Sequence, residues 1–223
     1  MSKIHSPEAM LLISVKCPHC ASVMQSLGEL VKQGDIASLE IINLEKKPEV
    51  AEALGVRSVP WVKIGWFELE GLHSQKELQQ KARQAGSDEG ALAYISEELL
   101  EGRVNKVLSL LDRQHDLMPH ILDLLGDAEA KLNIRLGVGV VMEEYAAADW
   151  FEPYIAQLAQ YAQHKDERVR ADVCHYLSLT ESKDAVATIK SLLIDVSEEV
   201  REVAKESLDD LSEAGVISTG EWL

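Results

Sequence analysis

Apolar and polar residues alternate in short blocks over the first 86 positions of the chain. The apolar run Ala9–Val15, in which only Ser14 is polar, has no helical gaps and predicts a buried strand. Behind it, apolar residues recur at helical spacing up to Gly34, a position typical of a residue that closes a helix. Residues 38–44 then alternate as a strand does, and residues 48–54 predict a short helix.

Two further strands and a helix follow in the same part of the chain. Residues 59–64 and 67–71 predict the strands, and Gly65-Trp66 between them fits a two-residue hairpin turn with glycine first. Ser74 is then expected to open a helix that runs to about Gln84. The predicted order of elements is therefore β-α-β-α-β-β-α.

From Ser87 onward the periodicity is helical throughout. Apolar spacing predicts helices near residues 88–101, 103–113, 117–125, 128–146, 150–163, 167–179, 183–193 and 197–212. Residues 214–223 show no periodicity, so we expect a terminal cap or a frayed tail there.

The charge of the chain changes at the same point. The 223 residues carry a net charge of −16, with ten basic and ten acidic residues in 1–86 against twelve and twenty-eight in 87–223. We therefore expect two domains, 1–86 and 87–223. The acidic part argues against binding to nucleic acid or anionic membranes and leaves protein partners. No apolar run approaches the ~20 residues of a membrane helix.

The cysteine usage and the N-terminus bear on the compartment. Three cysteines in a chain of this length do not make a disulfide framework. The first seven residues, Met1–Pro7, do not have the form of a signal peptide. We therefore expect a cytoplasmic protein.

The candidate chemistry lies directly after the first predicted strand, in Cys17-Pro18-His19-Cys20. In a cytoplasmic chain, Cys-x-x-Cys near a strand–helix–strand pattern indicates redox work. Pro18 suits the first turn of a helix, where its missing N–H costs nothing. The dipole and the unpaired N–H groups of a helix start favour a thiolate at Cys17.

Three features together resemble the thioredoxin fold over roughly residues 7–86. They are the Cys17–Cys20 turn, the stretch Gly55–Pro60 about forty residues later, and the hairpin that ends at Gly71. The resemblance implies that Cys17 attacks a substrate disulfide and that Cys20 resolves the mixed disulfide. A redox-active Cys17–Cys20 disulfide would then be the reacting group, and no other cofactor is expected.

The resemblance also assigns roles to the residues around Pro60. In thioredoxin-like proteins a cis proline faces the dithiol, and the preceding residue, here Val59, offers its backbone to an extended substrate. The alternative is a trans proline at an edge strand. Trp61 either belongs to the recognition surface or packs in the hairpin, and the sequence favours neither.

Three residues around the cysteines are expected to adjust the dithiol. Pro18-His19 resembles the pair in strongly oxidising bacterial disulfide oxidases, and the charges of Lys16 and His19 should lower the pKa of Cys17. Two departures from thioredoxin argue against efficient general disulfide reduction. Lys16 replaces the usual tryptophan, and Leu11-Leu12 stand where a buried acid is expected.

Other reactive residues have simpler interpretations. A zinc site at Cys17, Cys20 and His19 lacks a fourth ligand at suitable spacing, so no metal is expected. His115 and His120 are expected at the surface or at helix caps. Cys174 is interpreted as a core residue, because adjacent helical positions such as Cys174 and His175 do not face each other.

A weak repeat runs through the helical part. Ile134-Arg135, Val169-Arg170 and Val200-Arg201 recur at separations of 35 and 31, each early in the second helix of a pair. This pattern resembles HEAT repeats, whose helix pairs stack into a solenoid. The predicted architecture is thus an α/β thioredoxin-like domain followed by an all-α HEAT-like domain.

Two functions fit this architecture. In the first, the chain is a thiol–disulfide oxidoreductase whose helical repeats dock a protein substrate or partner. In the second, it is a non-catalytic interaction scaffold or adaptor, and the dithiol serves as a redox switch or has no role. The client protein and the oligomeric state are not encoded in any motif.

Overall fold

The computed structural model describes residues 6–218. Contacts between residues divide the chain into two compact units, Met1–Ala93 and Tyr94–Leu223. Helix α4 (Asp88–Leu100) runs across this division. The predicted division into 1–86 and 87–223 stays a prediction. None of the helices between residues 6 and 218 is both long enough and apolar enough to cross a membrane.

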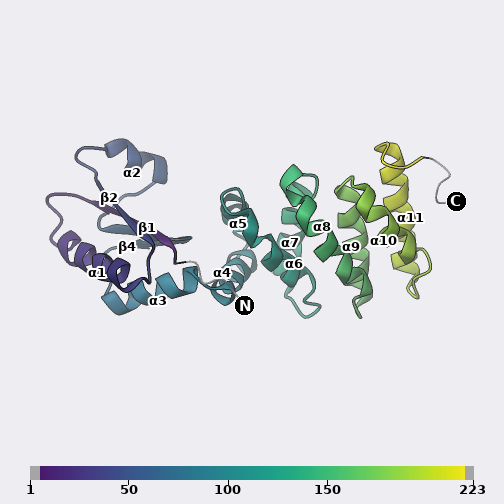
Figure 1. The fold of residues 1–223 in the computed structure, drawn as a ribbon, viewed down its shortest axis with the longest axis horizontal. Helices are drawn as coiled ribbons and strands as arrows, with labels where there is room; N and C mark the ends of the chain where they lie inside the picture. The colour runs from purple at the N-terminus through teal and green to yellow at the C-terminus, as the bar shows by residue number, and fades with distance from the viewer. Residues whose placement is uncertain (1–5, 219–223) are drawn as a thin grey trace. The chain divides into compact units, whose positions relative to one another are not determined.

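The first unit is a four-stranded sheet with helices on both faces (Figure 1). Its elements are β1 (Glu8–Ile13), α1 (Cys20–Gln33), β2 (Ser38–Asn43), α2 (Pro48–Leu54), β3 (Trp61–Ile64), β4 (Phe67–Glu70) and α3 (Gln75–Ala85). The strand order is β2-β1-β3-β4. Strand β1 is parallel to β2, whereas β3 is antiparallel to both β1 and β4.

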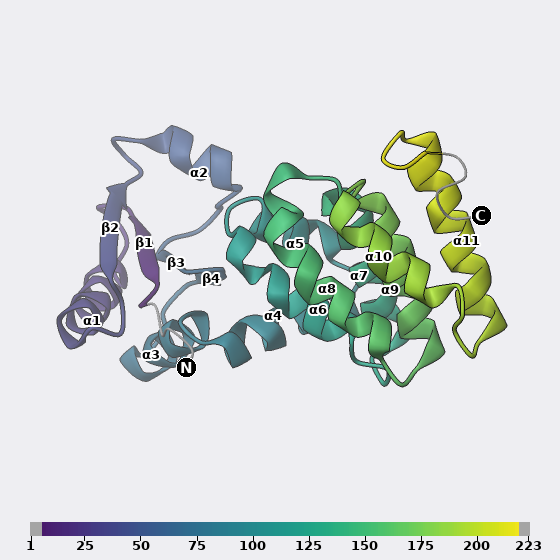
Figure 2. The ribbon, with the colours of Figure 1, turned by 45° about the vertical axis from the view of Figure 1, so that its right-hand side comes forward.

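The side chains of successive residues in β1 point to opposite faces of the sheet, as in any β-strand. Leu11 is fully buried in the cluster that α1 and α3 cover. Leu12 is fully buried on the other face, where Ile42 and Trp61 join it and α2 lies over them. Figure 2 shows the same layering, with α2 on one side of the sheet and α1 and α3 on the other.

The ends of the helices follow from their sequence. Gly34 closes α1 at φ 81° and Gly55 closes α2 at φ 67°, left-handed values that glycine adopts without a Cβ penalty. Helix α3 begins with a capping box in which Ser74 and Glu77 bind each other's backbone N–H. All three boundaries agree with the predictions to within one residue.

The structure corrects the prediction at the start of α1. The first strand ends at Ile13, two residues early, and α1 begins at Cys20 with His19 as its N-cap. Pro18 therefore lies in the turn before the helix and not in its first turn. In the turn between β1 and α1, Ser14 and Val15 donate hydrogen bonds to the side chain of Glu45 in the loop after β2.

The second unit is helical. After α4 come α5 (Val104–Leu111), α6 (Met118–Leu125), α7 (Leu132–Tyr145), α8 (Ile155–Gln160), α9 (Glu167–Leu179), α10 (Lys183–Leu192) and α11 (Glu198–Glu213). Short 3-10 helices span His115–Leu117, Asp149–Tyr154 and Tyr161–Gln163. The predicted helix 150–163 is thus divided, and Pro153, which has no N–H to donate, lies within the 3-10 segment before α8.

The chain after α11 turns back on the helix. The N–H groups of Val216 and Ile217 donate to the carbonyl of Leu211 at 2.9 and 3.4 Å, and Ile217 is buried. Residues 214–218 therefore act as the predicted cap. Residues 219–223 of that predicted tail lie outside the described residues.

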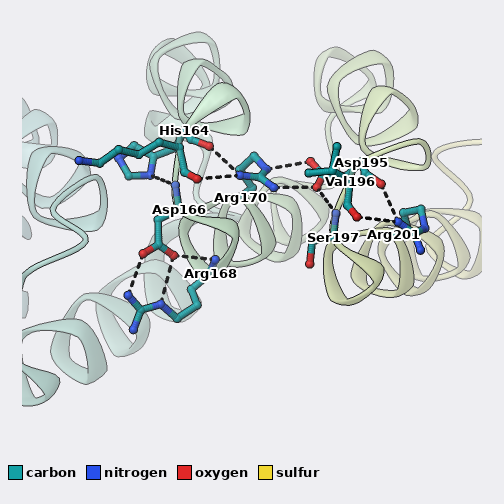
Figure 3. Close-up of polar contacts among 9 residues, drawn as sticks. His164, Asp166, Arg168, Arg170, Asp195, Val196, Ser197 and Arg201 are labelled. Atoms are coloured by element: carbon teal, nitrogen blue, oxygen red, sulfur yellow. Dashed lines mark hydrogen bonds and ion pairs between the residues drawn. The ribbon is translucent and has the colours of Figure 1, made fainter.

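Two arginines bind the loops between the helices in the same way (Figure 3). Arg170 donates to the carbonyls of His164 and Lys165, six and five residues earlier. Arg201 donates to the carbonyls of Asp195 and Val196 at the same offsets.

Arg170 also spans two loops. Its Nε and Nη2 each donate at 2.7 Å to the Asp195 carboxylate, and both side chains are 10% exposed. Asp195 in turn accepts from the N–H of Ser197. One carboxylate therefore binds the start of α11 to α9.

Candidate functional site

The strand register brings three loops to one edge of the sheet. Leu12 of β1 lies opposite Trp61 of antiparallel β3, so the residues after β1 meet the residues before β3. Ile13 lies beside Asn43 of parallel β2, so the loop after β2 ends at the same edge. The cysteine turn, the Val59–Pro60 stretch and the loop that carries Glu45 therefore converge there.

Cys17 and Cys20 are joined by a disulfide at this edge. Cys17 is half-buried in the turn, whereas Cys20 is 5% exposed at the first position of α1. The N–H of Cys20 donates to Sγ of Cys17 at 3.1 Å. The more accessible sulfur is thus the one that a helix N-terminal N–H contacts, which favours a thiolate at Cys17 after reduction.

The Val59–Pro60 peptide bond is cis, which confirms that prediction. The Val59 carbonyl oxygen lies 3.6 Å from Sγ of Cys17, and Pro60 is buried. The N–H of Gly71 donates to the carbonyl of Pro60 at 2.8 Å, which ties this stretch to the end of β4. A backbone carbonyl therefore lies beside the accessible sulfur.

Glu45 was not recognised as part of the site from sequence. Its Oε1 accepts from the N–H of Val15 and from Oγ of Ser14, both at 3.2 Å. The N–H of Glu45 donates to the side chain of Asn43 at 2.9 Å. The loop after β2 thus holds the turn that presents Cys17. An acid two residues past the end of a parallel strand was the only signal in the sequence.

The other residues predicted to belong to the site differ in their exposure to solvent. Lys16, Pro18 and His19 are exposed around the dithiol. Trp61 is only 2% exposed and packs in the core with Leu12. Its indole is therefore a packing element of the sheet, and the interpretation of that side chain as a recognition surface is wrong.

The sheet beneath the dithiol is apolar. Leu11 and Leu12 are both fully buried, and among residues 6–93 no carboxylate is buried. Proton transfer from Cys20 therefore has no buried acid on the described strands to assist it. The exposed carboxylate of Glu45 is instead bound to the preceding turn.

The remaining reactive residues lie in the helical unit. Cys174 is fully buried, as predicted, and burial raises the pKa of its thiol to about 11. His115 is exposed and stacks on Trp150 with ring centroids 4.1 Å apart. His120 is 8% exposed, so its predicted place at the surface is wrong, because it lies on the inner side of α6. Among residues 6–218, no cluster of His, Cys, Asp and Glu has the arrangement of a metal site.

Comparison with known proteins agrees with this geometry over the first unit. Residues 9–82, about a third of the chain, match a family model described as Thioredoxin domain. No curated protein matches the chain. With its mixed sheet, flanking helices and Cys17–Cys20 disulfide, the first unit is a thioredoxin-like domain, and an all-helical region follows it.

Proposed function

We propose that the chain is a thiol–disulfide oxidoreductase that acts on protein substrates through Cys17 and Cys20. The observation that carries this proposal is the asymmetry of the pair. The sulfur of Cys17 is accessible and contacts a helix N-terminal N–H, whereas Cys20 is buried one turn away. An accessible attacking sulfur and a protected resolving sulfur suit a two-step exchange.

The exchange balances without a further cofactor. In oxidation, a substrate thiolate attacks Sγ of Cys17, the Cys17–Cys20 bond breaks, and Cys20 leaves as a thiolate. A second substrate thiolate then attacks the substrate sulfur of the mixed disulfide and releases Cys17. The substrate loses two hydrogens and the dithiol gains them, and the same steps in reverse reduce a substrate disulfide.

Val59 has the position to align an extended substrate. Its carbonyl oxygen lies 3.6 Å from Sγ of Cys17, so a strand that pairs with the Val59 backbone would bring its own cysteine to the dithiol. Such pairing uses main-chain hydrogen bonds and tolerates many sequences. Selectivity would then have to come from elsewhere in the chain.

We assign that selectivity to the helical unit, as HEAT-like repeats that dock a protein partner in the cytoplasm. Arg170 and Arg201 support the repeat because each donates to the carbonyls six and five residues before it. Short helix pairs stacked in this way form extended surfaces suited to other proteins.

A non-catalytic role, as a scaffold or a redox-switched adaptor, is the second candidate. The observation in its favour is the apolar sheet below the dithiol, where Leu11 and Leu12 leave no buried acid to assist the resolving thiol. The two candidates differ in the rate at which the disulfide exchanges with a substrate.

The test measures that rate with a defined substrate. The oxidised chain is mixed with a synthetic peptide that carries two cysteines, and peptide oxidation is followed by mass spectrometry. If Cys17 is a good leaving group and electrophile, oxidation should exceed that by glutathione disulfide by on the order of a hundredfold. A rate equal to that of glutathione disulfide would favour the scaffold.

A matched pair of variants then identifies the attacking sulfur. With Cys20→Ser, a peptide carrying one activated thiol should remain attached to Cys17 as a stable mixed disulfide. With Cys17→Ser, the 5% exposure of Cys20 should prevent an adduct. Equal adducts from both variants would contradict the assigned roles.

A further inference from the structure

Helix α7 carries an exposed apolar stripe that the fold of the helical unit leaves uncovered. Leu132, Leu136 and Val140 are 66%, 61% and 42% exposed. They follow one another at four-residue spacing, so they share one face of the helix. Contiguous exposed apolar side chains are a feature of interaction surfaces, whereas apolar residues scattered singly over a surface are ordinary.

Contacts on both sides define where this stripe lies. On one side, Nδ2 of Asn133 donates to the carbonyl of Leu100 at the end of α4. On the other, Nη2 of Arg135 lies 3.5 Å from the Asp172 carboxylate of α9. The stripe therefore faces outward between two helices that flank α7.

The repeat separations of 35 and 31 relate this stripe on α7 to helices α9 and α11. The buried positions agree under these separations: Val138, Val173 and Ala204 are all 1% exposed or less. The stripe positions then correspond to Glu167, Ala171 and His175 on α9 and to Glu198, Glu202 and Glu206 on α11. The same face is apolar on α7 and entirely acidic on α11.

Carboxylates also border the stripe directly. Burial and the nearby charges of Asp172 and Glu143 raise the pKa of Tyr176, whose hydroxyl faces Gly139 of α7. Burial, and to a smaller extent the charge of Glu199, raise the pKa of Asp172, while the guanidinium of Arg135 acts in the opposite direction. Because Asp172 is paired with Arg135, α9 adds little net charge, and the negative charge of this face is concentrated on α11.

We propose that the face formed by α7, α9 and α11 docks a basic amphipathic segment of a partner protein. The apolar side of the segment packs on Leu132, Leu136 and Val140, and its Lys and Arg residues meet the glutamates of α11. The charge of the face selects this partner over an acidic or purely apolar one. This inference rests on the docking role proposed above and adds the surface and the chemistry of the partner.

The test measures peptide affinity by fluorescence anisotropy with the full chain. The protein carries Cys17→Ser and Cys20→Ser, so that binding is read without disulfide exchange and its failure is distinct from failure of the redox proposal. The probe is a labelled helical peptide with Leu on one face and Lys on the other. Two further peptides replace Lys by Glu, or Leu by Ser. Only the Leu/Lys peptide should bind well.

Variants of the face locate the binding. Leu136→Ser should raise the Kd about tenfold, because the leucine loses its apolar contact with the peptide. Glu202→Gln should raise it about threefold, and this effect should fade in high salt. Both positions are exposed, so the fold should persist, as circular dichroism can check.

Matched controls lie elsewhere on the same unit. Ile194→Ser removes an apolar side chain that is 87% exposed, and Asp184→Asn removes an exposed charge on α10. Both should leave the Kd within about twofold. Equal loss in the control and face variants would overturn the proposal, as would tight binding of the Leu/Glu peptide or no binding of the Leu/Lys peptide. A dimer in sedimentation velocity that Leu136→Ser dissolves would assign the face to a second copy instead.

Discussion

At the scale of single residues, the two sulfurs of the dithiol differ in what surrounds them. Sγ of Cys17 accepts from the N–H of Cys20 at 3.1 Å and lies in the turn before α1, where the dipole of the helix is positive. Lys16 and His19 are exposed on either side, so their charges act on Cys17 through solvent and are open to screening. The N–H and the helix dipole, not the neighbouring charges, are therefore the main stabilisers of a Cys17 thiolate.

This environment predicts a low pKa for Cys17 in the reduced protein. We expect its alkylation by iodoacetamide to reach half-maximal rate below pH ~8.5, the ordinary value for a cysteine. His19→Ala should move the midpoint only slightly, because the histidine is exposed. The rate is measured against pH by mass spectrometry of the Cys17 peptide.

Cys174 gives this measurement an internal control. It is fully buried and burial raises its pKa to about 11, so it should stay unmodified below pH 9 while the protein is folded. A Cys17 midpoint at or above the ordinary value would remove the basis for its role as the attacking sulfur. Labelling of both cysteines together would instead report unfolding.

At the scale of elements, the Arg170–Asp195 pair joins two helical loops. Arg170 hydrogen-bonds the carboxylate through two nitrogens and a carbonyl of its own loop through a third. Loss of either side chain leaves the other with an uncompensated charge at 10% exposure. Such a pair is costly to break from one side.

We therefore expect Arg170→Ala to lower the free energy of unfolding of the helical unit by about 3 kcal/mol. Arg168→Ala is the matched control. Its pair with Asp166 is also a two-nitrogen contact on α9, but the Arg168 side chain is 52% exposed, so the loss of stability should be far smaller than for Arg170→Ala. Urea unfolding followed by circular dichroism measures both. Equal losses of unfolding free energy in the two variants would mean that burial does not determine how much an ion pair contributes to stability.

The same pair predicts a dependence on pH. The hydrogen bonds from Arg170, with its charge, hold the pKa of Asp195 below the ordinary value of a carboxyl. A lowered pKa in the folded state contributes stability that is present above the unfolded pKa and is lost as pH falls through the folded pKa. Unfolding measured between pH 6 and pH 2 should show this loss in the wild type and a smaller one in Arg170→Ala.

Periodicity was a good guide to the elements and a poor guide to the site. The helices closed by Gly34 and Gly55 could be predicted because their ends are encoded by adjacent residues. The place of Glu45 could not, because its bonds to Ser14 and Val15 join loops about thirty residues apart. The position of the Trp61 side chain could not be predicted for a related reason. The face of the sheet to which it points depends on the register of β3 with β1.

The cis Val59–Pro60 bond was predicted from resemblance and not from local physics. Nothing in the residues around Pro60 distinguishes cis from trans without the fold. The exposed stripe of α7 could not be recognised from the sequence because its spacing is the same as that of a buried face. Apolar residues at helical spacing usually mark a buried face, so only the exposed fractions of Leu132, Leu136 and Val140 separate them from the core.

At the scale of the whole molecule, the two parts of the chain differ most in charge. Residues 1–86 balance ten basic against ten acidic residues, and the net charge of −16 comes from residues 87–223. Helix α11 alone carries seven acidic and two basic residues. Mutual repulsion within such a surface opposes the folded state and weakens as salt screens it.

We therefore expect salt to stabilise the helical unit selectively. Between 20 and 300 mM NaCl, protection of α11 amides against hydrogen exchange should rise about fivefold. Amides of β1 and β3, in the balanced part, should change little. The triple variant Glu198→Gln, Glu202→Gln and Glu206→Gln should show a smaller salt effect on α11, because it removes three of the repelling charges. If β1 and α11 respond equally to salt, the repulsion does not arise from the acidic helical surface. In that case repulsion among the acidic residues of α11 would not destabilise the isolated chain, and a basic partner would gain no binding free energy from neutralising it.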